Sequence, residues 1–176
     1  MTEAHELTKR YGDTTAVHSL SLTITPGTVT GFLGPNGAGK STTMRMIMGL
    51  DRPTSGTVTV NSKPHRQHRA PLREVGALLD AKAVHPGRNA RSHLRAMAAT
   101  HNIKASRVSE VIEMTGLAGV ATKRVGEFSL GMGQPLGIAA ALPGDPRTLI
   151  LDEPVNGLDP EACSGSDRLR SSSRLM

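Results

Sequence analysis

The sequence predicts an α/β fold in which antiparallel strands precede a parallel sheet. Three observations support this. Apolar and polar residues alternate in the first part of the chain, as they do in antiparallel strands. Thr28 to Leu33 has the pattern of a short strand, and a glycine-rich loop and a helical pattern follow it directly. A second apolar strand, Thr148 to Leu151, comes much later, and this order of elements is typical of α/β proteins.

The antiparallel strands are expected before residue 26 and again near residue 57. The alternating apolar positions are Val17, Leu20, Leu22 and Ile24, and a turn at Pro26-Gly27 ends them. Pro53 to Gly56 predicts another turn, after which Thr57 to Val60 alternates as a strand would. Val75 to Leu79 is a further candidate strand.

Helical patterns follow the glycine-rich loop and fill the middle of the chain. Ser41 to Met48 predicts a helix that Gly49 ends, with Met44, Ile47 and Met48 on its apolar face. From Ala90 to about Leu117 the pattern is again helical: Val108, Val111, Ile112 and Thr115 share a face, and Gly116 suits the C-cap. Ser129 would cap a last helix that runs to Leu142.

Composition narrows the class of protein. The net charge is +6, but the positive residues are scattered, and aromatic residues make up only 2% with no Trp, so nucleic-acid binding is not expected. Cys163 is the single cysteine, so no disulfide can form within the chain and a reducing compartment is expected. No apolar run approaches the roughly 18 residues of a membrane span. We expect a cytoplasmic protein that meets a membrane only through a partner.

The glycine-rich loop carries the most specific signal. Residues Gly34-Pro35-Asn36-Gly37-Ala38-Gly39-Lys40-Ser41 fit the pattern G-x-x-x-x-G-K-[ST] at every fixed position, and Thr42 follows them. Glycines allow backbone N–H groups to turn toward phosphate oxygens, and the next helix adds the positive end of its dipole. We expect Lys40 to reach the β- and γ-phosphates and the Ser41 hydroxyl to bind magnesium, as in a P-loop NTPase core with a parallel sheet.

A pair of acids forms the second motif. The apolar run Leu149 to Leu151 ends in Asp152-Glu153. Together with the phosphate loop, this pattern predicts Asp152 near the magnesium ion and Glu153 near the γ-phosphate, where a carboxylate could orient or deprotonate an attacking water.

These motifs together resemble the nucleotide-binding subunit of an ATP-binding-cassette (ABC) transporter, from Leu7 to about Glu161. Phe128-Ser129-Leu130-Gly131-Met132 stands where the family has its signature, and Asn156 to Asp159 matches the D-loop. Tyr11 stands where an aromatic ring stacks on adenine in the family. The residues from Gly31 to Thr59 most resemble drug-resistance exporters, in which the ATPase and membrane subunits are separate chains.

The resemblance implies the following activity and partners. Two such subunits dimerise head to tail, and each ATP lies between the phosphate loop of one and the signature helix of the other. Ser129 and Gly131 would therefore contact the γ-phosphate held by a second subunit. The implied protein is an ATP-hydrolysing subunit, peripheral on the inner face of the plasma membrane, that drives a membrane-spanning permease. Its cofactors would be ATP and Mg²⁺.

The sequence departs from the family at four places. Asp80 stands where a glutamine senses magnesium; its shorter carboxylate could reach the metal through water or be a solvated loop acid. Met132 replaces the signature glutamine. Gly133 and Pro135 replace basic residues, and a proline beyond the first helical turn breaks a hydrogen bond. No histidine follows Asp152, although the family has a switch histidine there. The residues around Arg174 weakly resemble the family's sequence at that histidine, with Arg174 in its place.

Three functional interpretations remain open. We expect residues 1–161 to form an ABC ATPase domain with a helical subdomain at about 85–143, and residues 162–176 to be an atypical, poorly ordered tail. The first interpretation is an exporter subunit. The second is a truncated or degenerate cassette that binds nucleotide and hydrolyses it poorly. The third is a soluble ABC ATPase unconnected with transport.

Overall fold

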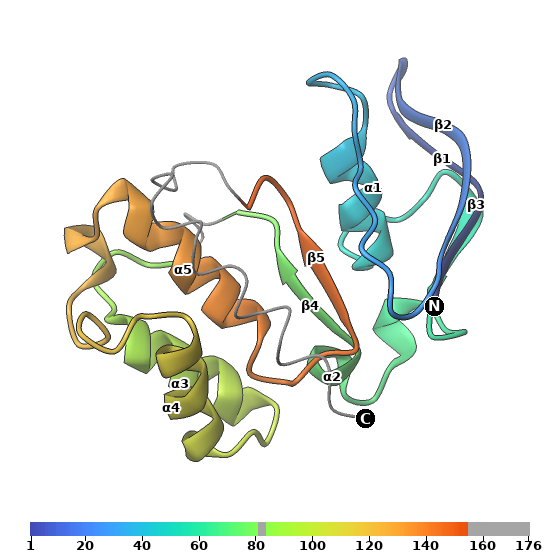
Figure 1. Ribbon diagram of the computed structural model, residues 1–176. Helices are drawn as coiled ribbons and strands as arrows, with labels where there is room; N and C mark the ends of the chain where they lie inside the picture. The colour runs from blue at the N-terminus through green and yellow to red at the C-terminus, as the bar shows by residue number, and fades with distance from the viewer. Residues whose placement is uncertain (81–83, 155–176) are drawn as a thin grey trace. The chain divides into compact units, whose positions relative to one another are not determined.

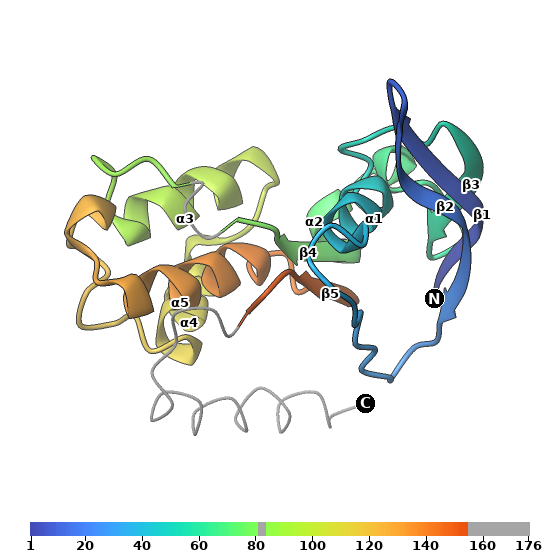
Figure 2. The ribbon, with the colours of Figure 1, turned by 90° about the horizontal axis from the view of Figure 1, so that it is seen from above.

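The computed structural model describes residues 1–80 and 84–154 (Figures 1 and 2). The chain divides into two compact units. Met1–Leu79 and Gly144–Asp152 form the first unit, and the described residues of Asp80–Pro143 belong to the second together with Glu153 and Pro154. Within the described ranges, no helix combines the length and the apolar character that a membrane crossing requires.

An antiparallel sheet of three strands opens the first unit. Its order is β2-β1-β3, with β1 at Thr2–Tyr11, β2 at Thr14–Ile24 and β3 at Ser55–Val60. Ala4, Leu7 and Val17 lie on the buried face, where they pack with Met46. Ala4 and Leu7 are three residues apart, and an irregularity in the pairing between them brings both to the same face. The predicted N-terminal antiparallel strands are therefore confirmed.

Helix α1, Lys40–Ile47, covers part of this sheet through contacts with β2 and β3. The predicted helix is confirmed, and Gly49 follows it with φ +68°. Its predicted apolar face is partly wrong. Ile47 is buried as expected, but the other buried residues are Thr43 and Met46. Packing against the two strands selects this face, and it leaves Met44 and Met48 only half-buried.

A second, parallel sheet of two strands lies in the first unit. β4, Val75–Leu78, follows the short helix α2, Pro71–Glu74, and pairs with β5, Thr148–Leu151. Both strands match their predictions closely. Val75 and Ile150 pack with Ile47 of α1 in one cluster, so the parallel sheet and the helix after the glycine-rich loop share a core. A 3₁₀ turn, His65–Gln67, precedes α2.

The strand predicted at Thr28–Leu33 is not formed, so that prediction is wrong for the structure. The side chains of Val29 and Leu33 are 95% and 96% exposed. A strand is stabilised by the hydrogen bonds of a neighbouring strand, and among the described residues β4 and β5 pair only with each other. Residues 28–33 therefore run as irregular chain into the glycine-rich loop.

Three helices form the second unit: α3 at Ala90–Thr100, α4 at Ala105–Met114 and α5 at Leu130–Ala141. Their buried side chains make one core, which includes Leu94, Val108, Val111, Ile112 and Leu136. A 3₁₀ turn, Val125–Glu127, precedes α5. Figure 2 shows the three helices grouped together.

The helical pattern expected from Ala90 to about Leu117 is two helices rather than one. Asn102, with φ +54°, lies in the turn between α3 and α4. Asn89 caps α3 by accepting a 2.7 Å hydrogen bond from the Ser92 N–H. Gly116, with φ +71°, ends α4 as predicted, and the Leu117 N–H returns to the Ile112 carbonyl at 2.9 Å.

Candidate functional site

The glycine-rich loop turns through conformations that only glycine adopts easily. Gly37 and Gly39 have φ of +84° and +80°, in the left-handed region. A Cβ at Gly39 would also collide with the Ala16 carbonyl oxygen and lie 2.9 Å from Cγ2 of Val17. Glycine is therefore required at position 39 for two reasons: the backbone angle there is positive, and β2 lies too close for a side chain.

Lys40 closes over this loop. Its Nζ donates to the carbonyl oxygens of Gly34 at 2.7 Å and Pro35 at 2.8 Å. Lys40 also begins α1, in which the Thr43 N–H bonds to the Gly39 carbonyl at 2.8 Å. The earlier N–H groups of a helix have no intrahelical acceptor and, with the helix dipole, attract anions. A cation and a helix N-terminus therefore occupy the same loop, which suits a phosphate ligand.

The residues after Lys40 suit a magnesium ion that is bound together with phosphate. Ser41 is exposed and Thr42 is half-buried. Within residues 1–80 and 84–154, no three His, Cys, Asp or Glu side chains gather as a metal site of their own. Mg²⁺ usually keeps several waters and binds through one or two protein oxygens and substrate phosphates. The Ser41 hydroxyl fits that mode of binding.

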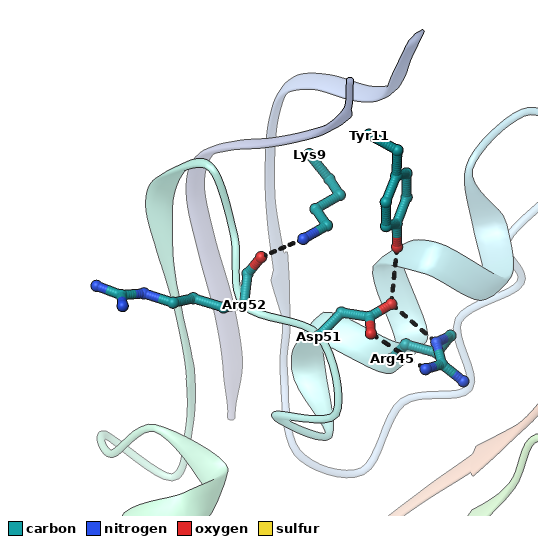
Figure 3. A network of polar contacts seen from close by, with 5 residues as sticks. All are labelled: Lys9, Tyr11, Arg45, Asp51 and Arg52. Carbon is teal, nitrogen blue, oxygen red and sulfur yellow. Dashed lines mark hydrogen bonds and ion pairs between the residues drawn. The ribbon is translucent and has the colours of Figure 1, made fainter. Parts of the chain in front are cut away.

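Tyr11 lies at the end of β1 in a network of polar contacts (Figure 3). Its hydroxyl donates to Oδ2 of Asp51 at 2.8 Å. Arg45 of α1 donates to the same carboxylate from Nε, at 2.8 Å to Oδ2, and from Nη2, at 3.1 Å to Oδ1. The ammonium of Lys9 lies 4.8 Å from the centre of the Tyr11 ring. Tyr11 as a whole is 48% exposed, which makes it a candidate for contact with a ligand.

The same contacts shift the ionisation of two groups. The hydrogen bonds from Arg45 and then from Tyr11 lower the pKa of Asp51 to about 2, so its carboxylate stays charged at neutral pH. The hydrogen bond to Asp51 raises the pKa of the Tyr11 hydroxyl above its ordinary value. Tyr11 was predicted as a site residue from the sequence. Asp51 and Arg45 were not, because no motif joins residues at that spacing.

The predicted acids follow β5 directly. The Asp152 N–H bonds to the Leu78 carbonyl at 2.8 Å, which extends the parallel pairing by one residue, and the Asp152 side chain is half-buried. Glu153 is exposed and has φ +46°, a left-handed conformation uncommon for a non-glycine residue. Its carbonyl oxygen accepts from Nε2 of Gln134 at 3.4 Å. Asp80, the other predicted metal ligand, is exposed after β4.

The signature residues begin α5 in the second unit. Ser129 occupies the N-cap position as predicted, but its side chain makes no capping hydrogen bond; its backbone carbonyl accepts from the Met132 N–H at 2.9 Å. The expected capping role of its hydroxyl is therefore wrong for the structure. Gly131 is half-buried in the first turn, and Pro135 lies inside the helix. Residues Asn156–Asp159, and the tail at 162–176, lie outside the described residues.

The chain is similar to proteins of known family. The family profile described as ABC transporter matches residues 17–156. The chain is 43% identical over 157 residues to the bacitracin transport ATP-binding protein BcrA of Bacillus licheniformis, covering 88% of this chain and 51% of that protein. It is 35% identical over 160 residues to the lantibiotic transport ATP-binding protein SrtF of Streptococcus pyogenes, covering 91% of this chain and 69% of that protein.

The fold has close counterparts among solved structures. The dimeric structure of MJ0796, a bacterial ABC transporter cassette, superposes with a TM-score of 0.86 at 24% identity, covering 97% of this chain and 82% of that chain. The chain spans about half the length of the BcrA relatives that it matches. The profile match extends over most of the chain, and SrtF is similar along most of its own length. This chain therefore belongs to the ABC transporter family.

Proposed function

We propose that this chain binds ATP with Mg²⁺ and, as the ATP-binding subunit of an exporter, supplies the energy of ATP hydrolysis to a separate membrane-spanning permease. The phosphate loop is the observation that carries the proposal. Its left-handed glycines, the cation of Lys40 and the start of α1 are combined within a few residues. That combination is specific for a nucleotide phosphate chain.

The binding roles follow from the contacts. When phosphate is present, the Lys40 ammonium exchanges its bonds to the Gly34 and Pro35 carbonyls for stronger charge-assisted bonds to phosphate oxygens. The glycines of the loop contribute backbone N–H donors, and Tyr11, which is nearly half exposed, offers its ring as a surface for the base.

The catalytic roles fall on the acidic and signature residues. Ser41 and Asp152 would hold Mg²⁺, with Asp80 contributing through water. The ion would neutralise phosphate charge as the bond to the leaving group breaks. Glu153 is positioned directly after Asp152, where its carboxylate could orient or deprotonate the attacking water.

A second subunit would complete the site. Ser129 and Gly131, at the start of α5, would contact the γ-phosphate bound by that subunit in a head-to-tail dimer. The solved structure of the MJ0796 cassette is dimeric, which supports dimerisation in general.

The relatives support the transport role. BcrA and SrtF are named as bacitracin and lantibiotic transport proteins, which favours export of an antimicrobial peptide through a permease. The chain would then lie on the cytoplasmic face of the membrane through that partner. Co-expression with a membrane-spanning protein encoded by a neighbouring gene tests this part of the proposal. Co-purification supports the transport role, and failure to associate favours a soluble ATPase.

The nucleotide site is tested by equilibrium titration with ATP·Mg. Lys40→Ala should remove most of the affinity, because it deletes the point charge that faces the phosphates. Lys123→Ala is the matched control, since Lys123 is an exposed lysine in the second unit. Undiminished ATP binding by Lys40→Ala would refute the site.

A binding-only cassette is the second candidate function. Pro135 interrupts the hydrogen bonds of the signature helix, and residues 28–33 form no strand. Both features could weaken turnover more than binding. Measured turnover close to zero in a chain that binds ATP·Mg would favour this candidate over the hydrolysing subunit.

A further inference from the structure

We propose that Asp51, Arg45 and Lys9 are positioning residues that hold the Tyr11 ring in place for a nucleobase and leave one of its two faces open. This inference rests on the proposed ATP site. It adds three residues that no sequence motif of the site contains.

Asp51 links the Tyr11 ring to the helix of the phosphate loop. The Tyr11 hydroxyl donates to Oδ2 of Asp51, and Arg45 holds both oxygens of the same carboxylate (Figure 3). Arg45 belongs to α1, the helix that begins with Lys40. The backbone also joins the two ends of the link, because the N–H groups of Leu50 and Asp51 both donate to the Arg45 carbonyl, at 2.9 and 3.4 Å. The ring is thereby connected to the element that carries the phosphate-binding lysine.

Lys9 lies over one face of the Tyr11 ring. Lys9 and Tyr11 are two residues apart on β1, so their side chains leave the strand on the same side. The Lys9 ammonium lies 4.8 Å from the ring centre and is itself held by a 2.7 Å hydrogen bond to the Arg52 carbonyl. A cation over the ring is attracted by the π electrons of that face. A base can therefore stack only on the opposite face.

The contacts of the Tyr11 side chain matter because the residue is so exposed. Tyr11 is nearly half exposed at the end of a strand, where an aromatic side chain can change rotamer freely. The hydrogen bond of its hydroxyl to Asp51 selects one orientation of the ring before the nucleotide binds. Less conformational entropy of this side chain is therefore lost on binding. The Asp51 carboxylate remains ionised throughout the physiological range, and the bond persists with it.

The test separates the base from the phosphates. The full chain is titrated with ATP·Mg and, separately, with inorganic tripolyphosphate and magnesium, which offers phosphates without a base. Tyr11 is the single tyrosine and Trp is absent, so the intrinsic fluorescence of the chain reports on this ring alone. ATP should change that fluorescence by stacking, and tripolyphosphate should change it far less.

The three substitutions should weaken ATP binding to different degrees. Tyr11→Ala should weaken ATP binding by about 5- to 150-fold, the range measured for loss of a stacked base. Asp51→Ala should weaken it by about 2- to 10-fold, as expected for one lost hydrogen bond. Lys9→Met should cause a loss of about 2- to 5-fold. Tripolyphosphate binding should stay within about twofold of wild type in all three, because the phosphate loop is intact.

Two further variants test the mechanism. Tyr11→Phe keeps the ring and removes its hydroxyl, so combining it with Asp51→Ala should weaken ATP binding no further than Asp51→Ala alone. Glu110→Ala is the matched control. It removes a carboxylate that pairs with Arg107 at 3.1 Å in the second unit, and it should leave both titrations and the fluorescence unchanged.

Failure of this inference differs from failure of the ATP site. If the wild type binds neither ligand, or if Lys40→Ala binds ATP normally, the proposed function itself is wrong. If Tyr11→Ala or Asp51→Ala binds ATP as the wild type does, the nucleotide site stands and the positioning role is wrong. If Asp51→Ala weakens ATP and tripolyphosphate equally, the residue supports the fold in general, and the inference is likewise overturned.

Discussion

Replacing Pro135 with alanine is expected to stabilise the chain by about 2–3 kcal/mol. Proline lacks an N–H, so position 135 donates no helix hydrogen bond to the Gly131 carbonyl four residues earlier. Its ring also crowds the preceding turn, and a proline inside a helix usually costs about 3 kcal/mol relative to alanine. Alanine restores the N–H, and the half-buried site does not have to accommodate a larger side chain.

Thermal unfolding followed by circular dichroism measures this effect. About 2–4 °C per kcal/mol is typical for a domain of this size, so the midpoint should rise by about 4–12 °C. Gly133→Ala is the matched control in the same helix, since its new Cβ would meet no atom within 4 Å. It should raise the midpoint by a smaller amount, from about 0.5–1 kcal/mol. A midpoint for Pro135→Ala at or below the wild type would refute the reasoning and show that the packing of Leu136 depends on the proline.

Three further predictions concern the site. Glu153→Gln keeps the shape of the side chain but removes a base, so it should retain ATP binding and lose phosphate release; unchanged turnover would exclude Glu153 as the catalytic base. Gly39→Ala should lower both the melting midpoint and the ATP affinity, because φ is +80° and the added Cβ would collide with the Ala16 carbonyl; a midpoint like that of the wild type would contradict this. The pKa of Asp51 is lowered from 3.8 to about 2, so its contribution to stability is present above pH 3.8 and is lost as the pH falls through about 2. An NMR titration of the Asp51 carboxyl with a midpoint near its ordinary value would show that the contacts with Arg45 and Tyr11 do not form in solution.

Elements with a strong local signal could be predicted from the sequence. The antiparallel strands and the short apolar strands Val75–Leu78 and Thr148–Leu151 follow from residue patterns within each segment. The buried face of α1 could not be predicted in full. Thr43 is buried there because the helix packs on two strands, although its side chain is less apolar than that of Met44. The turn at Asn102 was missed because a helical pattern continues on both sides of it.

Part of the candidate site could likewise be predicted from the sequence, and part could not. The phosphate loop and Asp152-Glu153 could be predicted as site residues because their proposed chemistry requires fixed residue types at fixed spacing. Asp51 and Arg45 are six residues apart, which is not a neighbouring position on a helix surface. They meet because the chain turns back after Gly49 and brings Asp51 beside the last turn of α1. Only the folded chain shows that this pair also reaches Tyr11.

Residues Thr28–Leu33 show why a strand pattern alone does not determine a strand. The pattern is strong, yet in the structure Val29 and Leu33 are almost fully exposed. Burying such a side chain contributes about 1.5–3 kcal/mol, so the two together represent about 3–6 kcal/mol that the described residues leave unused. That amount is a large part of the 5–15 kcal/mol that typically stabilises a domain. A neighbouring strand would supply hydrogen bonds as well as burial, and would hold the start of the phosphate loop in a sheet. The residues at 28–33 are therefore able to form a strand, but the strand forms only where a neighbouring strand pairs with it.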